Sequence, residues 1–176
     1  MVSFDTNVLI YATAAVADQR VGRARDLLAR ALQAANCVLL LQSLTEFSNV
    51  AIRKAGIPVE AVQRIVQAWC AVLPVQAAED SDLFTALDAV RTHRLTFWDA
   101  MLWASAQRTG VRHLLTEDFQ DGFVLQDVTF INPFIREKRS ADRKASAATL
   151  TGSCGSDRTR AGSMASRMRD QIGFAS

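Results

Sequence analysis

The sequence lacks the features of a disulfide-bonded, zinc-binding or membrane-spanning protein. Its three cysteines, Cys37, Cys70 and Cys154, are far apart, odd in number and outside any Cys-x-x-Cys or Cys/His cluster. Neither a disulfide framework nor a zinc site is therefore expected. No apolar run approaches the roughly 20 residues that a membrane-spanning helix needs, and an early acid with no basic residue before it is unlike a secretory signal. We expect a cytoplasmic protein with no membrane segment.

Charge is distributed unevenly along the 176 residues. Residues 1–135 contain 11 Lys and Arg against 14 Asp and Glu, a net charge of −3, whereas residues 136–176 contain 9 against 4, a net charge of +5. The second segment is rich in Arg, Lys, Ser, Ala, Gly and Thr and shows no sustained period. We expect one globular domain at 1–135 and a disordered, solvated basic tail at 136–176, with nonspecific binding of nucleic acid phosphates as an alternative role.

Short apolar runs of strand length alternate with segments of helical periodicity. The apolar run at 2–11 is interrupted by polar residues at 5–7, which predicts a buried strand that ends in a polar turn. Further strands are expected at 37–41, 73–75, 113–116 and 128–131, and helices at 18–34, 43–54, 58–72, 79–93 and 96–110. This alternation predicts the α/β class, with a short parallel sheet covered by helices on both faces in a three-layer α/β/α arrangement.

The carboxylates of residues 1–135 fall at places where a site can form. Asp5 and the pair Glu117 and Asp118 follow predicted strands, and sites in open α/β sheets form beyond the carboxyl ends of strands. Asp99 and Glu46 lie in the predicted first turns of two helices, among apolar neighbours. A carboxylate in an apolar setting is costly unless it is paired or bound to a metal.

Several carboxylates that converge without as many cations repel one another. A divalent cation relieves that repulsion, and oxygen ligands with open positions favour Mg²⁺, with Mn²⁺ as a substitute. Such ions bind phosphate and activate water for attack on a phosphodiester. The two histidines, His93 and His113, lie outside the acidic segments, so a histidine general base is not expected.

Each acid taken alone also has a structural explanation. Glu46 is placed to complete a helix capping box with Ser43, and Asp99 is placed to interact with a helix dipole. Glu117 and Asp118 together fit a solvated turn. Asp5 is the hardest to explain in this way, because it interrupts an apolar strand before a polar turn.

Four segments resemble the motifs of a known family. The run DTNVLIY at 5–11 resembles the N-terminal motif of PIN domains, particularly of the VapC-type toxins of bacterial toxin–antitoxin pairs. The segments SLTEF at 43–47, FWDA at 97–100 and LTEDFQDG at 115–122 resemble those that bear the second, third and fourth acids of the family. They follow in the family's order and at similar spacing. The resemblance extends over residues 1–135, and the basic tail is not part of the family pattern.

The resemblance implies a PIN-like fold and a magnesium-dependent endoribonuclease that is inhibited by a cognate antitoxin protein and forms a homodimer. It implies that Asp5 and Asp99 are direct metal ligands and that Glu46 completes the acidic pocket or helps to position water. Asp118 is favoured over Glu117 as the fourth acid and a further ligand. The remaining implied residues orient the acids, namely Thr6 or Asn7 beside Asp5 and the hydroxyl of Thr116.

Four residues lie near the third acid in the sequence, and three of them have a second interpretation. Arg108 and Arg112 follow the helix of Asp99 and are weak candidates for contact with RNA phosphates, the alternative being a solvated helix end. Trp98 and Trp103 are expected to pack in the core, although an exposed Trp98 beside Asp99 would be able to stack on a base.

Two other functions compete with the nuclease. A catalytically silent PIN-like module would bind RNA or a partner protein and cleave nothing. A phosphatase or phosphoacceptor domain would use Asp5 as its nucleophile, since an acid at the end of the first strand is common to those chemistries. Asn7 stands where such domains usually carry a second acid, which argues against this function.

Overall fold

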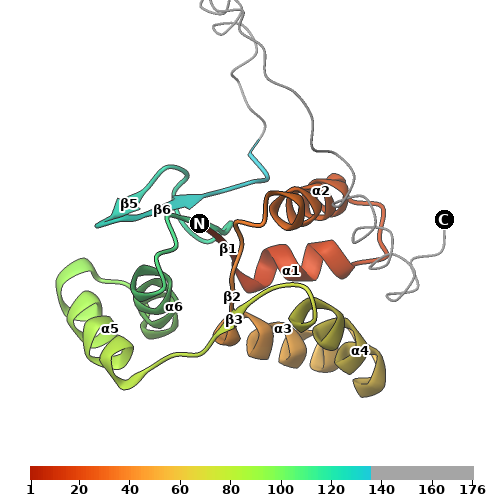
Figure 1. Ribbon diagram of the computed structural model, residues 1–176, viewed down its shortest axis with the longest axis horizontal. Helices are drawn as coiled ribbons and strands as arrows, with labels where there is room; N and C mark the ends of the chain where they lie inside the picture. Colours follow the sequence, from red (N-terminus) through yellow and green to blue (C-terminus); the bar gives the residue numbers. More distant parts are fainter. Residues whose placement is uncertain (136–176) are drawn as a thin grey trace, which may run out of the picture.

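The computed structural model describes residues 1–135, and the expected tail at 136–176 lies outside the described residues. Strands and helices alternate over most of the described chain, as the sequence predicts (Figure 1). The strands are β1 (Val2–Phe4), β2 (Leu39–Leu40), β3 (Val75–Gln76), β4 (His113–Leu115), β5 (Val124–Leu125) and β6 (Val128–Ile131). The helices are α1 (Thr6–Thr13), α2 (Gln19–Ala34), α3 (Leu41–Arg53), α4 (Val59–Cys70), α5 (Asp80–His93) and α6 (Phe97–Arg108).

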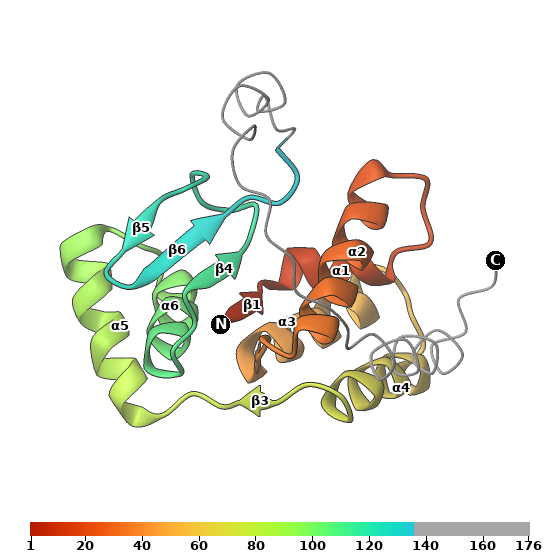
Figure 2. The same ribbon diagram turned by 45° about the horizontal axis from the view of Figure 1, so that its top comes forward.

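The strands form a four-stranded sheet in the order β1-β4-β6-β5 and a separate pair of β2 and β3. Within the larger sheet β1, β4 and β6 are parallel, and Phe4 is aligned with Leu115 at the carboxyl ends of β1 and β4. A single parallel bridge between Val2 and Cys37 joins β1 to the segment before β2. Figure 2 shows β5 at the outer edge of the larger sheet. The sheet is therefore mostly parallel.

Successive side chains of the strands face two separate hydrophobic clusters. Phe4, Leu39 and Leu115 pack in one cluster, together with apolar residues of α1, α2, α3 and α4. Leu40 and Leu114 pack in the other, together with residues of α5 and α6. Because neighbouring side chains of a strand point to opposite faces of a sheet, each face is covered by its own group of helices. The structure confirms the predicted three-layer α/β/α class.

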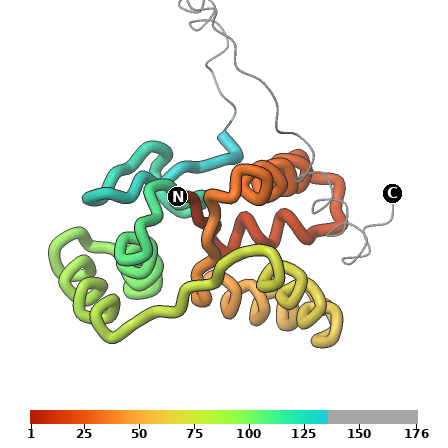
Figure 3. The backbone as a smooth tube through the Cα atoms, viewed as in Figure 1, coloured from red at the N-terminus to blue at the C-terminus, as the bar shows by residue number. Residues whose placement is uncertain are grey.

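The two helical groups come from different parts of the chain. In Figure 1 α5 and α6 lie together at one end of the molecule, and α1 to α4 gather at the other. The tube in Figure 3 shows the same separation between its green segment and its red-to-yellow segments. Side chains from both groups can meet only along the boundary between them, and the carboxyl ends of β1 and β4 reach that boundary.

Helix α2 illustrates how the outer helices are built. Its buried residues Val21, Ala24, Leu28 and Ala31 recur at helical spacing, and arginines occupy the positions between them. Asp18 caps the helix through a hydrogen bond from the backbone N–H of Arg20. Among the helices of residues 1–135, none is long and apolar enough to cross a membrane.

The predicted strand before Asp5 is present, but the polar turn expected at 5–7 is instead the start of a helix. β1 ends at Phe4, and the chain enters α1 at Thr6 without an intervening turn. Asp5 is the N-cap of α1, and its carboxylate accepts a hydrogen bond from the backbone N–H of Thr6. The apolar run after Asn7 has no period that distinguishes a buried strand from a buried helix. Asp5 therefore both ends a strand and begins a helix.

The predicted start of α3 is also wrong. The helix begins at Leu41, directly after β2, with Leu40 as its N-cap and no side-chain hydrogen bond to the cap. Ser43 is fully buried inside the helix, and its hydroxyl has no hydrogen-bond partner within residues 1–135. Glu46 consequently lies in the second turn of α3, where the capping-box explanation for it does not apply.

One edge of the predominantly parallel sheet carries an antiparallel strand. β5 pairs antiparallel with β6, and Gln126 in the tight turn between them has a left-handed φ of 50°. A strand of two residues is too short to show alternation of apolar and polar side chains in the sequence. The hairpin lies on the side of β6 away from β1 and β4, so it leaves the carboxyl ends of β1 and β4 unchanged.

Candidate active site

Two parallel strands end side by side and bring the first pair of polar residues together. The alignment of Phe4 with Leu115 makes Asp5 and Thr116 the next neighbours, and the backbone N–H of Asp5 donates to the carbonyl of Leu115 at 2.9 Å. The Thr116 hydroxyl donates to Asp5 Oδ2 at 2.7 Å. Thr116 is fully buried, so this hydroxyl orients the Asp5 carboxylate without competition from water.

The Asp5 carboxylate is buried in the presence of other acids. Only 6% of the residue is exposed. Burial raises the pKa of Asp5 from 3.8 to about 6, and the carboxylates of Asp118 and Glu46 add to the rise. Hydrogen bonds from the Thr116 hydroxyl and the Thr6 backbone N–H oppose it in part. The charged form of Asp5 is therefore destabilised in the folded chain, and a cation beside it would relieve the strain.

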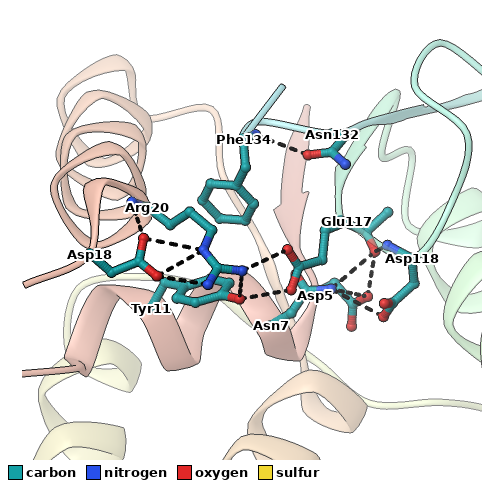
Figure 4. Close-up of polar contacts among 10 residues, drawn as sticks. Asp5, Asn7, Tyr11, Asp18, Arg20, Glu117, Asp118, Asn132 and Phe134 are labelled. Atoms are coloured by element: carbon teal, nitrogen blue, oxygen red, sulfur yellow. Dashed lines mark hydrogen bonds and ion pairs between the residues drawn. The ribbon is translucent and has the colours of Figure 1, made fainter. Parts of the chain in front are cut away.

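The amide of Asn7 connects Asp5 to the fourth acid. Its Nδ2 lies 3.1 Å from Asp118 Oδ2 and 3.5 Å from Asp5 Oδ2, and it also lies 3.4 Å from the Thr116 hydroxyl oxygen. The Asn7 Oδ1 atom is buried and has no hydrogen-bond partner within residues 1–135. Figure 4 shows Asp5, Asn7 and Asp118 grouped together. The Asn7 side chain therefore connects the Asp5 and Asp118 carboxylates through one amide nitrogen.

The neighbouring acid, Glu117, points to a different group. Its Oε1 accepts a hydrogen bond from the Tyr11 hydroxyl at 3.0 Å, and its Oε2 lies 3.6 Å from Arg20 Nη1. Arg20 also hydrogen-bonds to that hydroxyl, forms a close ion pair with Asp18 at 2.7 Å, and places its guanidinium over the Tyr11 ring (Figure 4). The charge of Glu117 is thus balanced by Arg20, whereas Asp118 remains beside Asp5.

Glu46 is held in place by two hydrogen bonds, one from α1 and one from its own helix α3. Its Oε2 accepts from the Thr6 hydroxyl at 3.2 Å and its Oε1 from Gln42 Nε2 at 2.9 Å. The same Gln42 nitrogen donates to the backbone carbonyl of Trp98 at 3.0 Å. Gln42 therefore connects α3 to the first turn of α6 across the boundary between the two helical groups.

Asp99 lies in the first turn of α6, as the sequence predicts. Thr96 is the N-cap, and its hydroxyl accepts from the Asp99 backbone N–H at 3.3 Å and donates to Asp99 Oδ2 at 2.6 Å. The interaction with the helix end expected for this acid is therefore present. Asp99 also lines the same cleft as the other acids. Its interaction with the helix end and its place in the acidic site are therefore compatible.

These acidic side chains line one open cleft. Its volume is about 540 Å³, and it lies between α1, α3, the start of α6 and the loop after β4. All five predicted acids line it, together with Thr6, Asn7, Ile10, Tyr11, Gln42, Val50, Lys54, Trp98 and Leu102. The acids come from four separate segments of the chain, and Lys54 is the single Lys or Arg among the described residues that line the cleft.

The oxygen atoms that this cleft offers as metal ligands suit a hard divalent cation. They are carboxylate, amide and hydroxyl oxygens; among them the Asp5 carboxylate has a raised pKa, and the buried Asn7 Oδ1 is an acceptor without a hydrogen-bond partner within residues 1–135. In the part of the chain that the structure describes, no group of three or more His, Cys, Asp or Glu side chains is arranged to hold an ion by itself. Mg²⁺ is usually bound by one or two carboxylates with waters and substrate phosphates, so the residues fit such an ion.

The two arginines that were weak candidates for RNA contact lie outside the cleft. Arg108 donates to both oxygens of Asp82, to Glu79 and to the carbonyl of Ala77. Arg112 pairs with Asp127 at 2.9 Å. Because Asp82 is only 2% exposed, Arg108 serves to neutralise a buried carboxylate between α5 and α6. Both guanidiniums, which were weak candidates for RNA contact, are thus paired with carboxylates away from the cleft.

Replacing Arg108 with alanine is expected to lower the free energy of unfolding by about 3 kcal/mol, because the Asp82 carboxylate would stay buried without its cation. Denaturant unfolding monitored by circular dichroism measures this. Arg91→Ala is the matched control, since Arg91 pairs with Asp88 on the exposed face of α5 and should cost less than about 1 kcal/mol. Equal losses in the two variants would contradict the prediction.

Sequence reasoning missed three polar residues that surround the acids. Tyr11, Gln42 and Lys54 all line the cleft. Tyr11 lies four residues after Asn7, so the two share a face of α1, but this spacing is informative only once 6–13 is known to be helical. Gln42 and Lys54 share the face of Glu46 on α3 in the same way, and the predicted helix start at Ser43 excluded Gln42.

The family model of the PIN domain matches residues 2–123. The chain belongs to the PIN domain family. This confirms the resemblance that the four acidic segments suggested, and the match contains all five acids of the cleft. A comparison with curated protein sequences gave no significant match.

Solved structures share the fold of this PIN domain at low sequence identity. VapC20 of Mycobacterium tuberculosis, described as a sarcin–ricin loop cleaving toxin, is 20% identical with a TM-score of 0.52, over 65% of this chain and 87% of VapC20. A toxin–antitoxin complex from Klebsiella pneumoniae is 18% identical with a TM-score of 0.56, and FitAcB from Neisseria gonorrhoeae is 16% identical with a TM-score of 0.57. Each of these two matches covers 76% of this chain and 98% of the other.

Proposed function

We propose that the chain is a metal-dependent endoribonuclease that hydrolyses RNA phosphodiester bonds and acts in the cytoplasm as the toxin of a toxin–antitoxin pair. The observation that supports this most is the convergence of carboxylates from four separate segments on one open cleft of a PIN domain. A cleft of this kind, with one lysine among its lining residues, would repel RNA unless a cation were bound.

Asp5, Asp99 and Asp118 are the residues that would hold Mg²⁺, or Mn²⁺ in its place, directly or through water. When bound, such an ion supplies charge stabilisation for the phosphodiester and lowers the pKa of a bound water. Thr116 and Asn7 keep Asp5 and Asp118 turned toward the ion position through the hydrogen bonds described above.

The residues around the acids have separate tasks in hydrolysis. Glu46, fixed by the Thr6 hydroxyl and by Gln42, would position the attacking water and accept its proton. Attack forms a bond from the water oxygen to phosphorus and breaks the bond from phosphorus to the leaving ribose oxygen, which takes up a proton from solvent water. Arg20 and Tyr11 keep Glu117 out of this arrangement, so its carboxylate does not compete with Asp118.

The toxin role, an antitoxin partner and a homodimer are further parts of the proposal. They are supported by the family and by the similarity of the fold to VapC20 and to a toxin–antitoxin complex. Expression of the chain in bacteria without an antitoxin should then arrest growth, and Asp5→Asn should relieve the arrest. A small reading frame directly upstream of the gene would favour the toxin role.

The deciding experiment is metal titration against a panel of structured RNAs, one of which is a sarcin–ricin loop stem-loop. We expect no cleavage in EDTA and cleavage that rises with added Mg²⁺ or Mn²⁺. Cleavage that persists in excess EDTA would disprove the metal-dependent mechanism. Tight binding of RNA without cleavage in either metal would favour the catalytically silent PIN module instead.

A further inference from the structure

The three tryptophans of the chain differ in exposure. Trp69 and Trp103 are 1% and 2% exposed and belong to the two hydrophobic clusters, whereas Trp98 is 63% exposed. Core packing was expected for both Trp98 and Trp103, but the structure shows Trp98 exposed and Trp103 buried. Core packing explains Trp103, whose Nε1 also donates to the carbonyl of Leu125. It does not explain Trp98.

Trp98 is held at the edge of the acidic cleft. It lines the cleft and directly precedes Asp99, and its backbone carbonyl accepts the hydrogen bond from Gln42 that also serves Glu46. The ring packs nearly perpendicular to Phe97, with centroids 5.3 Å apart. An exposed aromatic residue therefore lines the cleft directly before Asp99, and its backbone is connected to Glu46 through Gln42.

Lys54, the single Lys or Arg among the described residues that line the cleft, lies along α3 from the position of Trp98. Gln42, Glu46 and Val50 line the cleft on one face of α3, and Lys54, the C-cap residue, continues the same four-residue spacing. At 1.5 Å per residue, Lys54 lies about 12 Å along the helix from Glu46. Since Gln42 contacts the Trp98 backbone, this wall of the cleft runs from Trp98 past Glu46 to Lys54. This order matches what an RNA strand requires, a flat surface for a base and a cation for a phosphate.

We propose that Trp98 is the stacking surface for an unpaired base of the RNA substrate and that Lys54 binds a phosphate of the same strand beyond the acids. This rests on the proposed function and names its substrate class. A base inside a continuous duplex is stacked between its neighbours and cannot lie on an indole beside the cleft. The preferred substrate is therefore a loop, a bulge or a single strand.

Intrinsic fluorescence tests the stacking directly, because Trp98 is the exposed tryptophan of the three. The probe is an RNA stem-loop, titrated into the Asp5→Asn chain so that it stays uncut, with a continuous duplex of the same length as its control. We expect quenching by the stem-loop and little by the duplex. Trp98→Phe in the same background should remove the quenching, because Trp69 and Trp103 are buried. Equal quenching by both RNAs, or quenching that survives Trp98→Phe, would overturn the proposal.

Affinity for a labelled stem-loop separates the two contacts. Trp98→Ala is expected to weaken binding about tenfold and Trp98→Phe to retain most of it, since any aromatic ring stacks on a base. Phe84→Ala is the matched control, because Phe84 is 66% exposed on α5 and does not line the cleft.

Lys54→Gln is expected to reduce the slope of log affinity against log salt by about 0.7, because one phosphate contact is lost. Arg53→Gln, which changes a residue outside the cleft, should leave this slope unchanged.

The remaining outcomes distinguish this inference from the proposed function. Unchanged RNA affinity in Trp98→Ala, with normal cleavage by wild type, would overturn the stacking role and leave the nuclease standing. A shift of Trp98→Ala in gel filtration without any loss of RNA affinity would assign the indole to a protein interface and also overturn it. Stem-loop binding that depends on Trp98 in a chain that cleaves nothing would support the stacking role while the nuclease function fails.

Discussion

Replacing Asp5 with asparagine is expected to lower the rate of RNA cleavage roughly a thousandfold while the chain stays folded. Asparagine has nearly the shape of aspartate, and its Oδ1 can still accept the hydrogen bond from Thr116 or the Thr6 backbone. It lacks the negative charge that a divalent cation requires. Initial rates on a stem-loop RNA at saturating Mg²⁺ measure the loss.

The control for this substitution is Asp88→Asn, which removes a carboxylate from the exposed face of α5. Asp88 does not line the cleft, so its variant should cleave at the wild-type rate. Near-normal cleavage by Asp5→Asn would exclude Asp5 from the reaction. Equal losses in both variants would show that the total charge of the chain matters rather than this one carboxylate.

The same substitution should change how stability depends on pH in EDTA. The pKa of Asp5 is 3.8 in the unfolded chain and is raised by burial to about 6 in the folded one. Below pH 3.8 both states are protonated. Between pH 3.8 and 6 the unfolded state loses its proton first, so the free energy of unfolding falls as pH rises, by about 3 kcal/mol in all.

Urea unfolding at pH 4 and pH 7 tests this difference. Between these two pH values the fall should be smaller in Asp5→Asn by about 2 kcal/mol, because the Asp5 carboxyl of the unfolded wild-type chain is already partly ionised at pH 4. Added Mg²⁺ should stabilise the wild-type chain and affect the variant much less, because the ion binds the folded state. Identical pH profiles for the two chains would rule out a strained Asp5 carboxylate.

The adjacent acids of the loop after β4 should respond differently to neutralisation. Asp118→Asn is expected to reduce cleavage about a hundredfold, because Asp118 faces Asp5 across the Asn7 amide. Glu117→Gln should reduce it less than about fivefold, since the Glu117 carboxylate is occupied by Arg20 and Tyr11 in a partly exposed pair.

The concentration of Mg²⁺ that gives half-maximal cleavage separates ligand loss from general damage. It should rise in Asp118→Asn and stay near the wild-type value in Glu117→Gln. The two substitutions are matched, because each removes one negative charge at neighbouring positions of the same loop. A larger effect of Glu117→Gln would mean that the Arg20 contact opens when RNA or metal binds and that Glu117 is the fourth acid.

Local sequence patterns predicted much of this arrangement. A polar residue that follows a short apolar run marks a strand end, and parallel neighbours put such ends together, which is why Asp5 and Thr116 meet. Thr96 and Asp99 form a helix start that their spacing in the sequence is sufficient to predict. The start of α3 was mispredicted because a serine near a helix start resembles a cap, whereas burial of Ser43 depends on which face of the helix meets the core.

The sequence by itself determined the α/β class, the PIN family and the set of acids, since these depend on residue type, order and spacing. Only the tertiary structure decided which of Glu117 and Asp118 faces Asp5, because that choice rests on Arg20 and Tyr11, which lie about a hundred positions away in the chain. It likewise separated the exposed Trp98 from the buried Trp103 and paired Arg108 with Asp82. Spacing along a helix tells which residues share a face, but the element that packs against that face comes from elsewhere in the chain.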